Sequence, residues 1–131
     1  MGSTDRVLPD TCAWIDFFNA RRTPLAKALE NLLVHGDVYT CGVVKYELVQ
    51  GLRGKDEERT LLEALQAVTH KEMSETLWLD AGRLSAALRK KGVPLPFSDI
   101  LIAAVALKND LTVLTVDRHF DQIPRLRVLA E

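Results

Sequence analysis

The sequence has few of the features that mark a secreted, membrane-spanning or generally nucleic-acid-binding protein. It has 2 cysteines, and 17 Lys and Arg residues against 18 Asp and Glu give a formal net charge of -1. Its longest uncharged apolar run, around residues 100–107, is far shorter than the roughly 20 residues of a membrane helix. Its start lacks the apolar core of a signal peptide. We therefore expect a cytoplasmic protein with no membrane contact and no general basic surface for nucleic acid.

The two cysteines, Cys12 and Cys41, lack the spacing of a metal-binding pair. We interpret them as two small buried thiols in preference to a disulfide or a zinc site.

The length of 131 residues, 47% of them hydrophobic, allows one domain with a sizeable core. No internal repeat, low-complexity tract or linker divides the chain. We expect residues 1–131 to form a single domain, with residues 1–5 either disordered or not native to the protein.

The apolar spacing predicts strands that alternate with helices. Strands are expected at 6–8, 38–41, 67–69, 111–116 and 127–129, and helices at 14–18, 24–35, 42–51, 57–65, 75–91 and 99–107. Thr23 and Ser74 are expected helix caps. This alternation predicts an α/β fold, a three-layer α/β/α sandwich around a mainly parallel sheet.

Four acidic residues stand where an apolar segment gives way to a turn or a helix: Asp10, Glu47, Asp99 and Asp117. Asp10 and Asp117 follow expected strands, and ligands bind beyond the carboxyl ends of parallel strands. Asp99 opens a helix that is apolar on every side and is therefore expected to be buried. A buried helix should not begin with an unpaired carboxylate.

Clustered carboxylates need protons or a cation, since two of them about 4 Å apart repel by roughly 4 kcal/mol at an effective dielectric near 20. All-oxygen ligand sets favour Mg²⁺ or Mn²⁺. Taken singly, three of the four acids also have an ordinary structural interpretation. Asp10 and Asp99 fit helix caps, and Asp117 fits an Asx turn.

Four ordered stretches together resemble the PIN domain, and more narrowly the VapC toxins of bacterial toxin–antitoxin pairs. They are residues 7–15 (VLPDTCAWI), 43–51 (VVKYELVQG), 96–106 (PFSDILIAAVA) and 114–120 (LTVDRHF). The resemblance covers nearly the whole chain and implies an Mg²⁺- or Mn²⁺-dependent endoribonuclease with an RNA substrate and a VapB-type antitoxin. Pro9 and Cys41 depart from the usual residue types, and neither departure removes an acid.

The resemblance assigns the catalytic acidic quartet to Asp10, Glu47, Asp99 and Asp117. Asp10 and Asp99 are then the principal metal ligands, and Asp117 coordinates directly or through water. Glu47 orients the attacking water or completes a second metal site.

Thr115 matches the hydroxyl position that often supports the metal site in this family. Thr11 and Ser98 are further supporting candidates, and Ser98 fits a helix cap equally well.

Candidate RNA contacts are Lys45, Arg118 and His119, which lie beside the expected ligands. Lys45 and Arg118 fit ion pairs with neighbouring carboxylates equally well, and for His119 we favour a simply solvated side chain. Asp16 and Asp121 lie near the motifs without a motif position, so we expect them on the surface.

We expect the chain to form a homodimer on two grounds. Its sequence has more apolar surface than a domain of this size readily buries, and related toxins commonly form homodimers. The residues concerned are the leucines of Leu25–Leu33 and the aromatics Trp14, Phe17 and Phe18. Together with Phe97, these aromatics are expected in the core or against a partner rather than stacked on bases. We also expect an antitoxin segment to bind along the Leu25–Leu33 helix and place a basic side chain among the acids.

Two other function classes fit parts of the sequence. A receiver-type phospho-accepting domain would need paired acids after the first strand and a lysine after the strand at 112–115, and the sequence has neither. A catalytically silent PIN-like RNA-binding or scaffold module would be expected to have lost one or more of the four acids.

Overall fold

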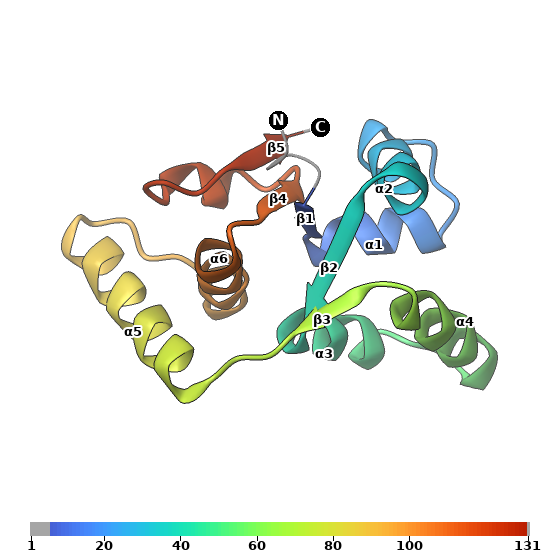
Figure 1. The fold of residues 1–131 in the computed structure, drawn as a ribbon, viewed down its shortest axis with the longest axis horizontal. Coiled ribbons are helices and arrows are strands. Elements are labelled where there is room, and N and C mark those ends of the chain that lie inside the picture. The colour runs from blue at the N-terminus through green and yellow to red at the C-terminus, as the bar shows by residue number, and fades with distance from the viewer. Residues whose placement is uncertain (1–5, 131) are drawn as a thin grey trace.

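Five parallel strands form the centre of the computed structural model, which describes residues 6–130 (Figure 1). They are β1 (Arg6–Pro9), β2 (Asp37–Cys41), β3 (Thr69–Lys71), β4 (Thr112–Thr115) and β5 (Val128–Ala130), in the spatial order β3-β2-β1-β4-β5. Every pairing among these strands is parallel. The expectation for residues 1–5 lies outside the described part of the chain.

Helices cover both sides of this sheet. They are α1 (Thr11–Phe18), α2 (Pro24–His35), α3 (Gly42–Gln50), α4 (Lys55–Gln66), α5 (Glu75–Lys90) and α6 (Phe97–Asn109), followed by a short 3-10 helix, η2 (Arg118–Gln122). In Figure 1, α6 lies to the left of the strands with α5 outside it, and α1 and α2 lie to the right. The predicted three-layer α/β/α sandwich is confirmed.

The central strand β1 fixes where the site lies. Its residues pair with β2 on one side and β4 on the other, with Pro9 opposite Leu114. The backbone N–H of Asp10 continues this ladder by donating to the Leu114 carbonyl at 2.9 Å. Because parallel strands end at the same edge, residues that follow β1 and β4 meet there.

Helix α6 supplies the largest continuous part of the core. Its residues from Asp99 to Ala106 are all buried, as expected for a helix that is apolar around its whole circumference. The helix packs against α5 and contacts β4. This packing places the first turn of α6, including Asp99, next to the carboxyl edge of the sheet.

Several element boundaries differ from the predicted ones by one to three residues, and the differences at α1, β3 and α6 have clear causes. Helix α1 begins at Thr11, three residues early, because Asp10 caps it. Helix α4 continues to Gln66, so that β3 begins only at Thr69. Helix α6 begins at Phe97 with Pro96 at the N-cap position, so of the two interpretations left open for Ser98 the helix cap does not hold.

The residues expected to drive self-association are already packed inside the monomer. Trp14, Leu25 and Leu29 are fully buried, and Phe17 and Phe18 pack against the core. The structure therefore removes the surface on which that expectation was based, and homodimer formation stays an untested prediction.

Phe97 was expected in the core or against a partner, and a core position is wrong. Its exposed fraction is 70%, and it stacks on the half-exposed Trp78 of α5 with ring centroids 6.4 Å apart.

No helix within the described residues is long and apolar enough to cross a membrane.

Candidate active site

Asp10 is both a helix cap and a buried acid of the site. Its Oδ1 accepts the Thr11 N–H at 2.7 Å, and its Oδ2 accepts the Thr115 hydroxyl at 2.9 Å. The Cys12 thiol lies 3.6 Å from the same Oδ2. Burial raises the pKa of the Asp10 carboxyl, and the Thr115 hydrogen bond opposes that shift. The cap interpretation and the site interpretation therefore describe the same residue.

Thr115 links the first and last acids of the sequence. Its hydroxyl, which is buried at the end of β4, also accepts the Asp117 N–H at 2.8 Å. The Thr115 hydroxyl therefore contacts both Asp10 and the turn that carries Asp117. This is the supporting place that the sequence predicted for Thr115. Asp117 in turn caps η2 by accepting the His119 N–H at 2.9 Å.

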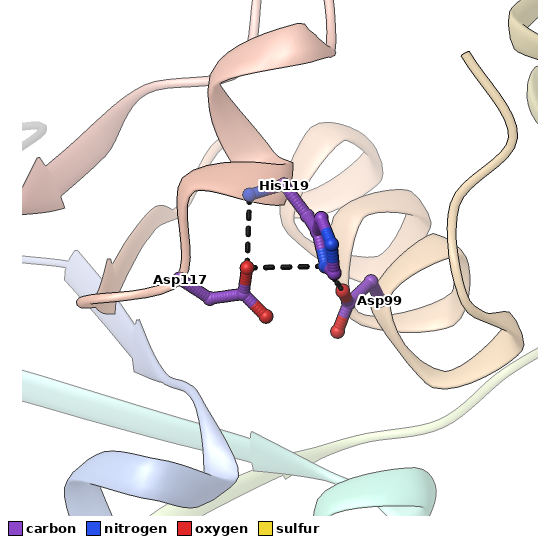
Figure 2. A group of neighbouring side chains, drawn as sticks. All are labelled: Asp99, Asp117 and His119. Atoms are coloured by element: carbon purple, nitrogen blue, oxygen red, sulfur yellow. Dashed lines mark hydrogen bonds and ion pairs between the residues drawn. The ribbon is translucent and has the colours of Figure 1, made fainter.

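Asp99 and Asp117 meet around the imidazole of His119 (Figure 2). The His119 Nδ1 atom lies 2.8 Å from Asp99 Oδ2 and 3.1 Å from Asp117 Oδ1. The Asp99 side chain is only 9% exposed, whereas the His119 side chain is 50% exposed. The expectation that His119 is simply solvated is wrong.

Burial raises the pKa of Asp99 to about 6. The hydrogen bond with His119 lowers it, while the nearby negative charges of Asp117 and Asp10 raise it further. The same hydrogen bond that lowers the pKa of Asp99 raises the pKa of the His119 imidazole. Three of the four predicted acids therefore lie within electrostatic reach of one another.

Glu47 joins the site through Thr11, whose hydroxyl donates to Glu47 Oε1. Together these contacts form one continuous series of hydrogen bonds through all four acids, which we call the acidic network. It is made of Glu47, Thr11, Asp10, Thr115, Asp117, His119 and Asp99. The structure thus brings together the predicted quartet and two of the three predicted supporting residues.

Three predicted residues do not join the acidic network through any described contact. Ser98 lies in the first turn of α6, and Lys45 is half-buried on α3. The Arg118 guanidinium points to Asp121 instead, with Nε 3.0 Å from its carboxylate. Asp121 is thus an exposed ion-pair partner, as expected for a surface residue.

Asp16 does not lie free on the surface as predicted. Its side chain is 17% exposed, accepts the Thr23 hydroxyl at 2.9 Å and pairs with Arg21 at 3.4 Å. The Asp16 side chain therefore stabilises the turn between α1 and α2. The sequence signal for this role was the cap Thr23, whose hydroxyl is free to donate while its oxygen accepts the Ala26 N–H.

Both cysteines are free thiols, and only Cys41 is fully buried as predicted. Cys12 is half-buried beside Asp10, a position that the sequence indicated only through its place two residues after a ligand candidate. Burial and the Asp10 charge raise the pKa of Cys12 to about 11, so the thiol is neutral at ordinary pH.

A cavity of about 690 Å³ adjoins the site on the side of Glu47. It is lined by Ile15, Phe18, Asn19, Glu47, Leu48, Gly51, Leu52, Arg53, Asp56, Glu57, Thr60 and Leu61, from α1, α3, α4 and the loop between α3 and α4. Along the helix expected to bind the antitoxin, Leu25 and Leu29 face the core, whereas Leu33 lines a smaller cavity of about 230 Å³. Antitoxin binding along Leu25–Leu33 stays a prediction.

The donor atoms of the site fit a divalent cation. One carboxylate oxygen each from Asp99 and Asp117 and a ring nitrogen of His119 all lie within 4.8 Å of one another. Carboxylate oxygens suit Mg²⁺ and Mn²⁺, and an imidazole nitrogen suits transition metals.

Comparison with known proteins gives consistent matches over nearly the whole chain. Residues 7–126 match the family model described as PIN domain. Ribonuclease VapC21 of Mycobacterium tuberculosis is 30% identical over 125 residues, which cover 92% of this chain and 87% of the relative.

Solved structures share the fold. The DNA-bound VapBC from Salmonella typhimurium superposes with a TM-score of 0.81 at 20% identity, covering 95% of this chain and 97% of that chain. A toxin–antitoxin complex from Klebsiella pneumoniae gives a TM-score of 0.72 at 26% identity, covering 95% and 96%.

Proposed function

This chain belongs to the PIN domain family, and we propose that it is a metal-dependent endoribonuclease that acts as the toxin of a toxin–antitoxin pair. The observation that carries the proposal is the acidic network, in which four acids from four parts of the chain share one series of hydrogen bonds. The name of the relative Ribonuclease VapC21 supports the same activity. Mg²⁺ or Mn²⁺ is the proposed cofactor.

We assign the metal-holding role to Asp99 and Asp117, with Asp10 completing the set. A bound divalent cation supplies Lewis-acid chemistry that offsets the negative charge gained by the phosphodiester during hydrolysis. Glu47 lies beyond Thr11, where its carboxylate can accept a proton from an attacking water. Thr115 and Thr11 keep Asp10 in place by hydrogen bonds to its two oxygens.

RNA contacts are proposed for Lys45 and Arg118, which would bind backbone phosphates near the acids. Arg118 already pairs with Asp121 at the surface, and exposed pairs of this kind are worth about 0–1 kcal/mol. A phosphate can therefore displace Asp121 at small cost.

The direct test is cleavage of single-stranded RNA by the purified chain. We expect cleavage with Mg²⁺ or Mn²⁺, none after EDTA, and recovery when excess metal is added back. Full cleavage activity in metal-free buffer would refute the metal-dependent mechanism. Binding of RNA without cleavage under any metal would favour the alternative of a silent RNA-binding module.

The cavity between α1, α3 and α4 is the proposed docking site for an antitoxin segment. Its apolar lining suits an amphipathic segment, and Glu47 suits a basic side chain, whereas Glu57 and Asp56 already pair with Arg53 and Arg59. Since the cavity reaches Glu47, a bound arginine or lysine would also neutralise one end of the acidic network. The solved neighbours that are toxin–antitoxin complexes support a partner of this type.

Growth of a bacterial host tests the toxin role. The wild-type chain expressed alone should arrest growth, Asp10→Ala should not, and co-expression of the antitoxin encoded beside it should restore growth. Equal toxicity of wild type and Asp10→Ala would show that any harm is unrelated to cleavage. With RNA as the substrate and an antitoxin as the partner, the proposed site of action is the cytoplasm. The predicted homodimer is tested separately, by sedimentation equilibrium.

A further inference from the structure

His119 occupies a position that neither the fold nor the local turn requires. The turn is closed by the backbone N–H of His119, which donates to Asp117 Oδ1. The imidazole itself comes from η2, reaches toward α6, and lies between the carboxylates of Asp99 and Asp117 (Figure 2). Any residue except proline could supply the N–H, so the turn does not explain why a ring nitrogen faces both acids.

The distances around this nitrogen match those between neighbouring ligands of one metal ion. In an octahedral site with ligands about 2.1 Å from the ion, adjacent ligand atoms are about 3 Å apart. The His119 Nδ1 atom lies 2.8 Å from Asp99 Oδ2 and 3.1 Å from Asp117 Oδ1. All three atoms lie within 4.8 Å of one another, so a single ion can contact each of them.

We propose that His119 is a direct metal ligand through Nδ1 and that it makes this site prefer Mn²⁺ over Mg²⁺. The proposal rests on the proposed function, in which this site holds a divalent cation. Mg²⁺ strongly favours oxygen donors, whereas first-row transition ions, including Mn²⁺, accept an imidazole nitrogen more readily than Mg²⁺ does. A site with two carboxylates and one imidazole therefore discriminates between two ions that a purely acidic quartet would treat more alike.

The side chain is well placed to act as a ligand that forms and breaks contact with an ion. It is 50% exposed, so its removal leaves no cavity in the core, while Asp99 beneath it is 9% exposed and fixed at the start of α6. A substitution at His119 should therefore change metal binding without unfolding the protein, which makes the proposal testable.

Two variants separate the ligand role from simple occupancy of the space. His119→Ala removes the donor. His119→Asn places an amide oxygen near the position of Nδ1 and so replaces a nitrogen donor by an oxygen donor. His35→Ala is the matched control, because His35 ends α2 before β2 and so lies at the opposite edge of the sheet.

The experiment measures Mn²⁺ and Mg²⁺ affinity of the metal-free full chain at pH 8 by calorimetry, with Mn²⁺ electron spin-echo spectroscopy to detect a bound nitrogen. We expect wild type and His35→Ala to bind Mn²⁺ at least about 10-fold more tightly than Mg²⁺ and to show ¹⁴N coupling. His119→Ala should weaken Mn²⁺ binding by about 10–100-fold and change Mg²⁺ binding by less than about 3-fold. His119→Asn should bind both ions about equally, without ¹⁴N coupling.

Unchanged or tighter Mn²⁺ binding by His119→Ala would overturn the proposal and make His119 an ion-pair partner that competes with the metal. Absence of ¹⁴N coupling in wild type would overturn it as well. Asp99→Asn distinguishes this failure from failure of the proposed function. If Asp99→Asn abolishes Mn²⁺ binding while His119→Ala does not, only the role of His119 is lost. If wild type binds neither ion, the metal site itself is refuted.

Discussion

Asp10 and Asp99 are almost equally buried, yet their carboxylates are held in opposite ways. Both oxygens of Asp10 already accept hydrogen bonds, from the Thr11 N–H and the Thr115 hydroxyl. Asp99 faces the half-exposed imidazole of His119 and the carboxylate of Asp117. We call Asp10, Thr11, Cys12 and Thr115 the closed half of the site, and Asp99, Asp117 and His119 the open half.

This difference indicates a division of labour between the halves. Hydrogen bonds in the closed half join β1, α1 and the end of β4, so they fix geometry. The open half collects negative charge with few donors, which is why burial and neighbouring charges raise the pKa of Asp99 to about 6. We therefore expect loss of the short hydrogen bonds made by Thr115 in the closed half to cost both stability and activity, and substitutions in the open half to cost activity without lowering stability.

The largest expected effect is loss of cleavage in Asp99→Asn. The amide keeps the shape but removes a charged ligand, so RNA cleavage should fall by more than about 100-fold, since even residues that only support metal ligands cost about 10–100-fold. Asp121→Asn is the matched control, because Asp121 lies near the site but pairs with Arg118 on the surface. A rate within threefold of wild type for Asp99→Asn, measured on the same RNA, would remove Asp99 from the metal site.

Thr115→Val should affect both activity and stability. Valine keeps the volume but removes the hydroxyl that donates to Asp10 and accepts from Asp117, so we expect a loss of about 1–3 kcal/mol in the free energy of unfolding. Cleavage should also fall by about 10–100-fold. Urea denaturation and initial cleavage rates measure the two effects.

Thr40→Val is the matched control for this prediction. Thr40 is also a fully buried strand threonine, but its hydroxyl has no hydrogen-bond partner within the described residues. Its replacement should leave stability unchanged or slightly raised. Equal destabilisation by both substitutions would mean that the closed half is not held by the Thr115 hydrogen bonds.

These two halves also differ in how well the sequence predicts them. Asp10 and Asp117 follow strands, and Asp99 opens an apolar helix, so local patterns with parallel topology suffice to predict where they gather. The role of His119 is not predictable locally, since its partner Asp99 lies 20 residues away and only the packing of α6 against η2 brings them together.

The elements of the fold are likewise predictable where the local sequence pattern is strong. Helix α6 and strand β4 were predicted from apolar runs that the core buries from Ile100 to Ala106 and from Leu111 to Thr115. The position of β3 was missed by two residues, because this short strand at the sheet edge has one exposed and two half-buried residues and hence no apolar signal. Long-range packing, rather than local preference, fixes where it begins.

Asp99→Asn should also have a smaller effect in metal-free buffer. There the substitution should raise the stability of the protein, whereas it lowers the cleavage rate when metal is present. Because burial raises the pKa of Asp99 from 3.8 to about 6, wild type should lose stability as pH rises through that range, and above it the ionised carboxylate is a net cost. Asparagine carries no such charge, so in EDTA at pH 8 the variant should be more stable by about 1 kcal/mol. Urea denaturation at pH 5 and pH 8 should show the difference growing with pH. A variant less stable than wild type at pH 8 would mean that the His119 contact outweighs the charge repulsion.

The smallest expected effect belongs to Cys12, and it tests how the closed half is held. The thiol lies 3.6 Å from Asp10 Oδ2 and 3.8 Å from the Thr115 hydroxyl, distances at which sulfur is a weak hydrogen-bonding group. Since Thr115 already donates to the same oxygen at 2.9 Å, Cys12→Ser and Cys12→Ala should each change the free energy of unfolding by less than about 1 kcal/mol. Cleavage should stay within about threefold of wild type. If Cys12→Ala instead lowered stability and cleavage as much as Thr115→Val, Asp10 would depend on the thiol as strongly as on the hydroxyl. The closed half would then be a network of equal contacts rather than one organised by Thr115.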